Sequence, residues 1–116
     1  MEYIRKPVKR ISERVILKQV LLEASKLGCR VFRNETGLFE LKNGAWLSAG
    51  LCVGSSDIIG LAPDGRFLAI EVKAKGGTLS KEQRAFLSMV NNRGGIAFVC
   101  NDVANLKKLL DDAMKT

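Results

Sequence analysis

The sequence predicts an α/β domain in which a central mixed β-sheet is covered by helices. Helical and strand-like patterns follow one another in the order αββββαβα, and a strong turn signal at residues 62–65 joins two β-rich runs into a hairpin. The 116 residues contain no internal repeat, low-complexity tract or linker, so these elements are expected to share one core. We therefore expect one domain over residues 1–116, with a basic N-terminal arm at about residues 1–10.

The first expected element is a helix over residues 12–27. Ser12 is a favourable N-cap, and Gly28 follows the last apolar position as a helix stop. The apolar stripe at helical spacing is formed by Ile16, Leu17, Val20, Ala24 and Leu27.

Strand-like segments come next. Residues 29–34 and 38–41 flank the turn-like Glu35-Thr36-Gly37, which predicts a first hairpin, and residues 45–47 are a candidate for a short extra piece that the order above does not count.

The second hairpin has the clearest pattern in the sequence. Residues 57–61 and 66–73 are rich in β-forming side chains and are separated by Ala62-Pro63-Asp64-Gly65. A three-residue loop over residues 63–65, with glycine in the left-handed position, places Ala62 opposite Arg66. The same register, continued outward, places Asp57 directly opposite Glu71.

The remaining chain predicts a helix, a strand and a second helix. Ser80 caps the first of these helices, which runs to about Asn92, and residues 94–100 form the strand. The last helix covers residues 103–114, with an apolar stripe of Leu106, Leu109 and Leu110.

The opposed acids Asp57 and Glu71 are the strongest functional pattern. Like charges on facing positions of a hairpin destabilise it unless something neutralises them, and a divalent cation does so. Strand alternation puts Lys73 on the same face as Glu71. The structural alternative is that Asp57 is a turn residue and that Glu71 and Lys73 form an exposed ion pair; the three residues together favour a site.

Four further polar residues each allow two interpretations. Glu13 falls within the apolar stripe of the first helix, which points an acid inward, but an acid is also favoured in any first helical turn. Gln83 stands three residues after Ser80, a capping-box spacing that explains it without any function. Arg33 and Asn34 are either phosphate contacts or ordinary polar residues at a strand end.

Composition narrows the chemistry and the partners. Nineteen basic against twelve acidic residues give a net charge of +7, with an excess near the N-terminus that includes Lys6, Lys9 and Arg10, and such an excess favours polyanions. The chain has no histidine, so mechanisms that need an imidazole are excluded. No apolar run is long enough for a signal peptide or a membrane span, and the three cysteines match no disulfide framework, so we expect a cytoplasmic protein.

The ordered motifs resemble those of a known family. Gly54-Ser55-Ser56-Asp57, then Glu71-Val72-Lys73, then Gln83 are similar to the signature of the VRR-NUC nucleases, a branch of the PD-(D/E)xK superfamily with a restriction-endonuclease-like core. The resemblance extends over nearly the whole chain and departs from the superfamily name only in having Ser56 where a proline would precede the acid.

The resemblance implies a catalytic set and a metal. Asp57 and Glu71 would bind Mg²⁺, for which Mn²⁺ would substitute, with the backbone carbonyl of Val72 and the carboxylate of Glu13 as further ligands. Lys73 and Gln83 would complete the catalytic set. The residues expected to contact DNA are Lys6, Lys9, Arg10, Arg33, Asn34 and Lys75.

The resemblance also implies an activity, that of an endonuclease for structured DNA. Stand-alone members are similar to resolvases of four-way Holliday junctions from bacteria and viruses, which predicts a homodimer in a bacterial or virus-infected cell, acting in recombination or repair. The alternatives are a flap or duplex-nicking repair nuclease, and a catalytically silent DNA-binding module. A possible dimer surface is the apolar set Trp46, Leu47, Leu51 and Val53, for which core packing is the other interpretation.

Overall fold

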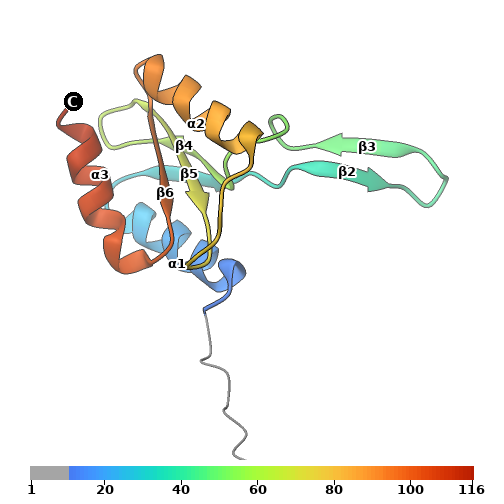
Figure 1. Cartoon of the computed structure of the whole chain (residues 1–116), viewed down its shortest axis with the longest axis horizontal. Helices are drawn as coiled ribbons and strands as arrows, with labels where there is room; N and C mark the ends of the chain where they lie inside the picture. Colours follow the sequence, from blue (N-terminus) through green and yellow to red (C-terminus); the bar gives the residue numbers. More distant parts are fainter. Residues whose placement is uncertain (1–10) are drawn as a thin grey trace, which may run out of the picture.

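The computed structural model describes residues 11–116, and the basic arm expected at residues 1–10 lies outside them (Figure 1). A four-stranded mixed sheet of order β1-β4-β5-β6 is flanked by helices, which confirms the predicted α/β fold and its restriction-endonuclease-like core. β2 and β3 form a separate two-stranded sheet. The elements are α1 (Glu13–Lys26), β1 (Arg30–Arg33), β2 (Gly37–Glu40), β3 (Trp46–Ala49), β4 (Ile58–Leu61), β5 (Phe67–Val72), α2 (Lys81–Asn92), β6 (Ile96–Cys100), the 3₁₀ turn η1 (Val103–Asn105) and α3 (Leu106–Met114).

Helix α1 has the start and the buried face that the sequence predicts. The Ser12 side chain accepts a hydrogen bond from the backbone N–H of Val15, so the helix is capped at its first turn. The four residues that α1 buries are Ile16, Leu17, Val20 and Ala24. Gly28 follows with φ of +94°, a left-handed conformation that glycine adopts without strain.

The β4–β5 hairpin also has the predicted register. Leu61 lies opposite Phe67, and Ile59 opposite Ala69. The loop closes as expected, because the Ala62 N–H donates to the Arg66 carbonyl at 2.9 Å. The ladder itself ends at Ile58 and Ile70, so Asp57 and Glu71 occupy the next opposed position, just beyond it.

The predicted first hairpin is wrong. β1 pairs antiparallel with β4, with Arg33 opposite Ile58, and not with β2. β2 pairs instead with β3, around a turn in which the Leu41 N–H donates to the Ala45 carbonyl. The reason is the Asn43-Gly44 dipeptide, a strong hairpin signal: the Asn43 side chain accepts from the Ala45 N–H, and Gly44 takes a positive φ.

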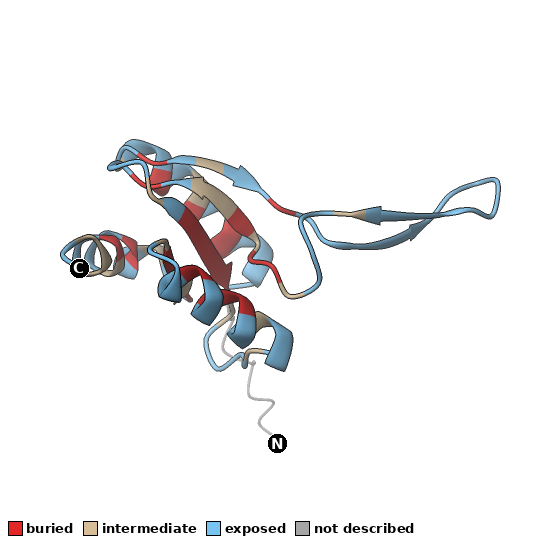
Figure 2. Cartoon of the chain, turned by 90° about the horizontal axis from the view of Figure 1, so that it is seen from above, coloured by how far each residue is buried: buried red, intermediate tan, exposed pale blue. Residues whose placement is uncertain are grey.

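The β2–β3 hairpin projects from the body of the molecule, and we call it the arm, residues 37–49 (Figure 1). Figure 2 shows it almost wholly exposed. Trp46 is 64% exposed, and Leu47, Leu51 and Val53 are exposed as well. The interpretation of these four residues as core is therefore wrong.

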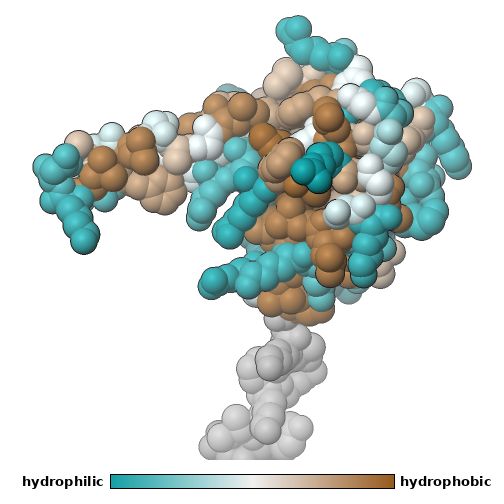
Figure 3. Space-filling model, turned by 180° about the vertical axis from the view of Figure 1, so that it is seen from behind, coloured by the Kyte–Doolittle hydropathy of each residue, from teal (hydrophilic) through white to brown (hydrophobic). Residues whose placement is uncertain are grey.

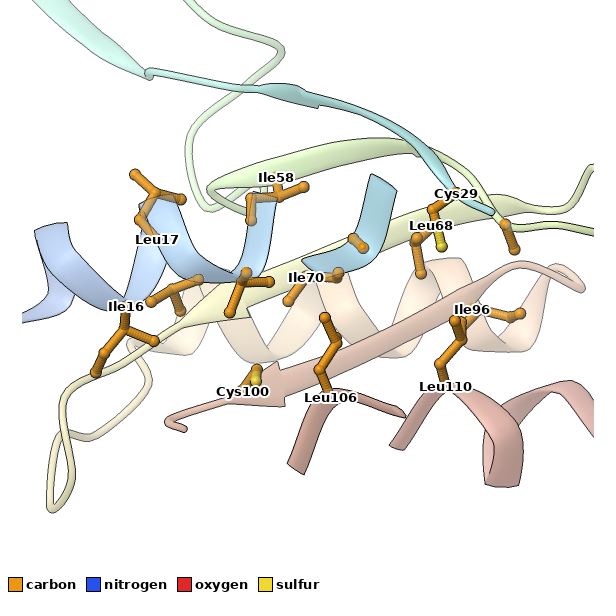
Figure 4. Close-up of a cluster of buried hydrophobic side chains, with 14 residues drawn as sticks. Ile16, Leu17, Cys29, Ile58, Leu68, Ile70, Ile96, Cys100, Leu106 and Leu110 are labelled. Carbon is orange, nitrogen blue, oxygen red and sulfur yellow. The ribbon is translucent and has the colours of Figure 1, made fainter. Parts of the chain in front are cut away.

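The sheet separates two groups of buried side chains. On one face, Leu68, Ile70 and Val72 of β5 pack with residues of α1 and α3 (Figure 4). On the other face, Ala69 packs with Phe86, Leu87 and Val90 of α2. The alternation along β5 puts Glu71 on the α2 face, with its carboxylate near the start of that helix. Within residues 11–116, no helix has both the length and the apolar character to cross a bilayer.

Candidate active site

Asp57 stands where the loop after the arm enters β4. One of its carboxylate oxygens, Oδ2, accepts a hydrogen bond of 2.9 Å from the backbone N–H of Val72, on the neighbouring strand. Its own backbone carbonyl accepts from the N–H of Asn34 at 2.7 Å. Asp57 is therefore fixed from both sides, by β5 and by the end of β1.

Asn34 shapes the loop that carries Asp57. Its side-chain amide donates to the Ser55 hydroxyl and to the Ser56 carbonyl, each at 2.8 Å, and its oxygen accepts from the Leu51 N–H. The residue is buried, and both amide hydrogens are used inside the protein. The predicted DNA contact of Asn34 thus conflicts with its position, because the side chain holds the loop and does not face solvent.

Gly54 brings the same loop against the start of α2. Its φ is +83°, and a Cβ at this position would lie 2.6 Å from the Glu82 backbone. Any side chain at position 54 would push the loop and the helix apart. This contact fixes the separation between Asp57, at the end of the loop, and the first turn of α2.

Glu71 is a buried acid, and its two carboxylate oxygens differ in their contacts. It is 1% exposed, and its Oε2 atom has no hydrogen-bond partner among the described residues. The other oxygen, Oε1, accepts from the Gln83 side chain at 3.1 Å and lies 3.9 Å from Lys73 Nζ. Burial raises the pKa of Glu71 to about 8, and the negative charge of Asp57 adds to the increase, whereas Lys73 opposes it.

Gln83 completes the capping box that the sequence predicts and also contacts Glu71. Its Oε1 accepts from the Ser80 backbone N–H at 2.9 Å, and Ser80 Oγ accepts from the Gln83 N–H, which completes a capping box. The amide nitrogen then points to Glu71. Because the backbone N–H of Ser80 can only donate, the capping box fixes which end of the Gln83 amide faces the acid.

Glu13 reaches the same end of the sheet from α1. Its Oε1 accepts from the Ala74 N–H at 3.2 Å, just after β5, and its charge is a further contribution to the raised pKa of Glu71. The residue as a whole remains exposed. Glu13 is therefore an exposed acid of the first helical turn whose carboxylate contacts the backbone just after β5, and its place in a metal site stays a prediction.

An open cleft of about 530 Å³ lies over this end of the sheet. Arg33 is in its wall and forms a loose ion pair with Glu35, at 3.7 Å. Arg14 also lies in the wall, although the sequence did not single it out as a DNA contact. In the sequence it is one of several basic residues near the N-terminus, and the helical pattern does not indicate which side of α1 borders the cleft. The lining residues are Glu13, Arg14, Leu17, Arg33, Glu35, Asp57 and Val72.

Of the other predicted DNA contacts, the structure describes Lys75 but not the three near the N-terminus. Lys75 is exposed in the turn after β5, close in sequence to Lys73. The predicted contacts Lys6, Lys9 and Arg10 lie outside the described residues. Within residues 11–116, the basic residues that line the cleft are therefore Arg14 and Arg33, whereas Lys73 lies beside Glu71, largely buried, and is not part of the lining.

The acids fit a divalent cation in part. In residues 11–116, no three acidic, cysteine or histidine side chains are grouped closely enough to form a ready metal cluster. Two features nevertheless suit a hard cation: the donor set consists of carboxylate oxygens, and the Oε2 atom of Glu71 is buried with no hydrogen-bond partner among the residues that the structure describes. A cation beside Asp57 and Glu71 would satisfy that atom and offset the repulsion between the two acids.

Comparison with protein families identifies a known domain in the chain. The model of the VRR-NUC domain matches residues 21–104, which is most of the chain. Asp57, Glu71, Lys73 and Gln83 lie inside the matched range, whereas Glu13 precedes it. No curated protein shows a significant match to the chain. The position of Glu13 in the candidate site therefore depends on the geometry alone.

Proposed function

The chain belongs to the VRR-NUC family, whose domain is a nuclease domain that acts on DNA, and on this premise we propose that it is a divalent-metal-dependent endonuclease for branched DNA. One observation carries the proposal. Glu71 is buried next to Asp57 with an oxygen that has no hydrogen-bond partner within residues 11–116, and its other oxygen lies near Lys73 and Gln83. Burying an acid without full hydrogen bonding costs folding free energy, and acids in such surroundings occur mainly at catalytic sites.

Asp57 and Glu71 would hold the ion, Mg²⁺ or Mn²⁺, and Glu13 and the Val72 carbonyl are further candidate ligands. When bound, a divalent ion activates water toward phosphorus and neutralises charge on the phosphate. The chain's own part is to hold the acids in place. The Val72 N–H fixes Asp57, Gln83 fixes Glu71, and the Ala74 N–H fixes Glu13.

Lys73 would act on the reacting groups. Its ammonium lies 3.9 Å from Glu71 Oε1 and is mostly shielded from solvent, so its charge is weakly screened. In this position it would orient or help to deprotonate the attacking water, and it would stabilise the negative charge that develops on the phosphate. Gln83 is a positioning residue, because its contact is with Glu71.

DNA would enter along the open cleft. Arg14 and Arg33 on its walls suit phosphate oxygens, and Lys75 extends the basic surface beyond β5. The Arg33–Glu35 ion pair is long and exposed, so a phosphate would displace Glu35 at small cost. Lys6, Lys9 and Arg10 would add phosphate contacts from the N-terminal segment.

The proposed substrate is the four-way Holliday junction, cut by a homodimer in recombination or repair. Resolving a junction needs two symmetric incisions, and a two-fold dimer supplies two sites with matching symmetry. The candidate site supports one incision per chain, since one pair of opposed acids occurs in it. The alternatives, a flap or duplex nuclease and a catalytically silent DNA-binding protein, are separated from this proposal by the assay below.

The test is a cleavage panel on duplex, flap and four-way junction DNA, each with Mg²⁺, Mn²⁺ or EDTA. We expect paired incisions in the junction with either ion and none in EDTA. Asp57→Asn and Glu71→Gln should each lower the single-turnover rate by at least about 10³-fold, while Asp111→Asn, an exposed acid of α3, should leave it unchanged.

Each other outcome assigns the protein differently. Cleavage of flaps with intact junctions would replace the substrate but keep the nuclease. Tight DNA binding without cleavage under any condition would favour the silent DNA-binding module, and full cleavage by Glu71→Gln would remove Glu71 from the site.

A further inference from the structure

The arm has one face that is made entirely of apolar residues. Cross-strand partners in an antiparallel pair lie on the same face, and the register pairs Phe39 with Leu47 and Leu38 with Ser48. Leu38 therefore lies on the opposite face from Phe39, together with Glu40 and Trp46. The apolar arm face consists of Gly37, Phe39, Leu41, Ala45, Leu47 and Ala49.

Nothing in the described part of the chain covers this face. Phe39 and Leu41 are each 42% exposed, and Leu47 is 50% exposed. β2 and β3 pack on each other and on no helix or strand of the body to a similar extent. An isolated two-stranded ribbon is marginally stable in water, and it usually needs a surface on which to bury its apolar side.

A second apolar feature lies on the body beside the base of the arm. It is a groove of about 260 Å³ between β5 and α2, and its exposed residues include Phe67 and Met89. Leu51, which follows the arm in the chain, is also part of the wall. Figure 3 shows hydrophobic side chains along the arm and on the adjoining part of the body. The groove residues are Leu51, Phe67, Phe86, Met89, Val90, Arg93 and Gly95.

We propose that the arm and the groove are the two halves of a dimer interface, in which two copies exchange arms. The two arms would run antiparallel about a two-fold axis, with the apolar face of each arm on the groove of the other copy. The position of Leu51 supports this arrangement: the groove begins where the arm ends, so the tip of an antiparallel arm reaches the partner's groove. The inference rests on the homodimer proposed above and assigns its surface.

Charge argues against DNA as the occupant of the apolar arm face. The arm carries one lysine and one glutamate, whereas the rest of the chain carries eighteen basic against eleven acidic residues. The apolar arm face has no cationic side chain, so it offers nothing to a phosphate backbone. A neutral and apolar arm face instead suits another apolar surface, and the groove of a second copy is one.

The area that a stable dimer must bury favours arms that lie on the partner's groove over arms that contact only each other. Stable protein complexes bury roughly 800 Å² on each partner. The apolar arm face has three large side chains, which is too small a surface for this. Exchange covers the arm and the groove of both copies in one symmetric contact.

The experiment measures mass and dimer dissociation by analytical ultracentrifugation. The wild type should have twice the 12.7 kDa chain mass. Phe39→Glu, on the apolar arm face, and Met89→Glu, in the groove, should each raise the dissociation constant at least about 30-fold. Leu38→Glu is the matched control: it is one residue away, is 69% exposed and lies on the other arm face, and it should stay dimeric.

The outcomes separate this inference from the proposed function. The arm exchange would be overturned by any of three results: a wild type that is monomeric, Phe39→Glu and Met89→Glu variants that remain dimeric, or a Leu38→Glu variant that dissociates as readily as Phe39→Glu. Circular dichroism of each variant checks that the body stays folded. A monomeric Phe39→Glu should still nick DNA at single sites and lose only the paired incisions. A dimer with the expected variant pattern and no cleavage would contradict the nuclease proposal but leave the interface standing.

Discussion

The end of the sheet and the arm depart from ordinary protein structure in opposite directions. At the end of the sheet, the acid Glu71 is buried, and one of its oxygens has no hydrogen-bond partner in the described part of the chain. On the arm, a continuous apolar face is exposed to solvent. Each region is unfavourable for the isolated chain. Under the two proposals above, each region is completed from outside the chain, one by a cation and the other by a second copy.

The largest expected effect is the pH dependence of the metal-free protein. The pKa of Glu71 is raised from 4.5 to about 8 in the folded state, so folding favours the protonated acid. This contribution is fully present below pH 4.5 and is lost as the pH rises through about 8. The unfolding free energy in EDTA should therefore fall over this range, by at most about 5 kcal/mol.

Urea denaturation at several pH values measures this fall. Glu71→Gln has no acid to titrate and should flatten the curve, and saturating Mg²⁺ should flatten it for the wild type. The apolar arm face has no titratable side chain, so the dimer mass should stay constant over the same range. An equal pH slope in Glu71→Gln would show that the slope comes from other groups.

The next effect separates chemistry from DNA binding at two neighbouring lysines. Lys73→Met removes the ammonium near Glu71 and should lower the single-turnover cleavage rate by about 10²–10³-fold, with DNA affinity changed less than about threefold. Lys75→Met, at an exposed position, should weaken DNA binding and leave the rate at saturation unchanged. Fluorescence anisotropy and rapid-quench cleavage measure the two quantities. The opposite pattern would make Lys73 a phosphate contact.

A smaller effect is expected at Gln83, where two substitutions separate its capping of α2 from its hydrogen bond to Glu71. Gln83→Ala removes the capping box and should destabilise the protein by about 1 kcal/mol. Gln83→Glu keeps the capping acceptor, so stability should change little, but it removes the donor to Glu71 and adds a negative charge. Both variants should lose about 10–100-fold in cleavage rate. If Gln83→Glu cleaves normally, the hydrogen bond to Glu71 is structural only.

The smallest effect is expected on the outer face of the arm. Trp46 lies opposite Glu40, away from the apolar arm face, and is largely exposed. Trp46→Ser should change the unfolding free energy by less than about 0.5 kcal/mol and should leave the dimer mass and the cleavage rate unaltered. Loss of the dimer in this variant would place the interface on the wrong side of the arm.

Sequence predicted those parts of the fold whose signals are local. Ser12 and the apolar spacing that follows it defined α1, and the Pro63-Asp64-Gly65 loop fixed the register of β4 and β5. That register alone brought Asp57 opposite Glu71, which is the centre of the candidate site. Helix and turn signals of this kind act over a few residues, so they can be read without tertiary information.

The parts that sequence did not predict depend on distant contacts. The partner of β1 is β4, more than twenty residues later, and the Asn43-Gly44 turn competes with Glu35-Thr36-Gly37 for β2. Asn34 was read as a strand-end or DNA-contacting residue because its partners in residues 51–56 are brought to it only by the fold. The unpartnered oxygen of Glu71 likewise exists only once α2 closes over the acid.

Because Gln83 belongs to the capping box of α2, the position of Glu71 depends on the first turn of that helix, which is among its least stable parts. Helix ends fray with small free energies, far below that of global unfolding. Each time the first turn of α2 opens, Gln83 releases both Ser80 and Glu71, because one amide makes both hydrogen bonds. Warming should therefore disorganise the acid well before the sheet melts, so that the catalytic rate declines at temperatures where far-ultraviolet circular dichroism still reports a native chain.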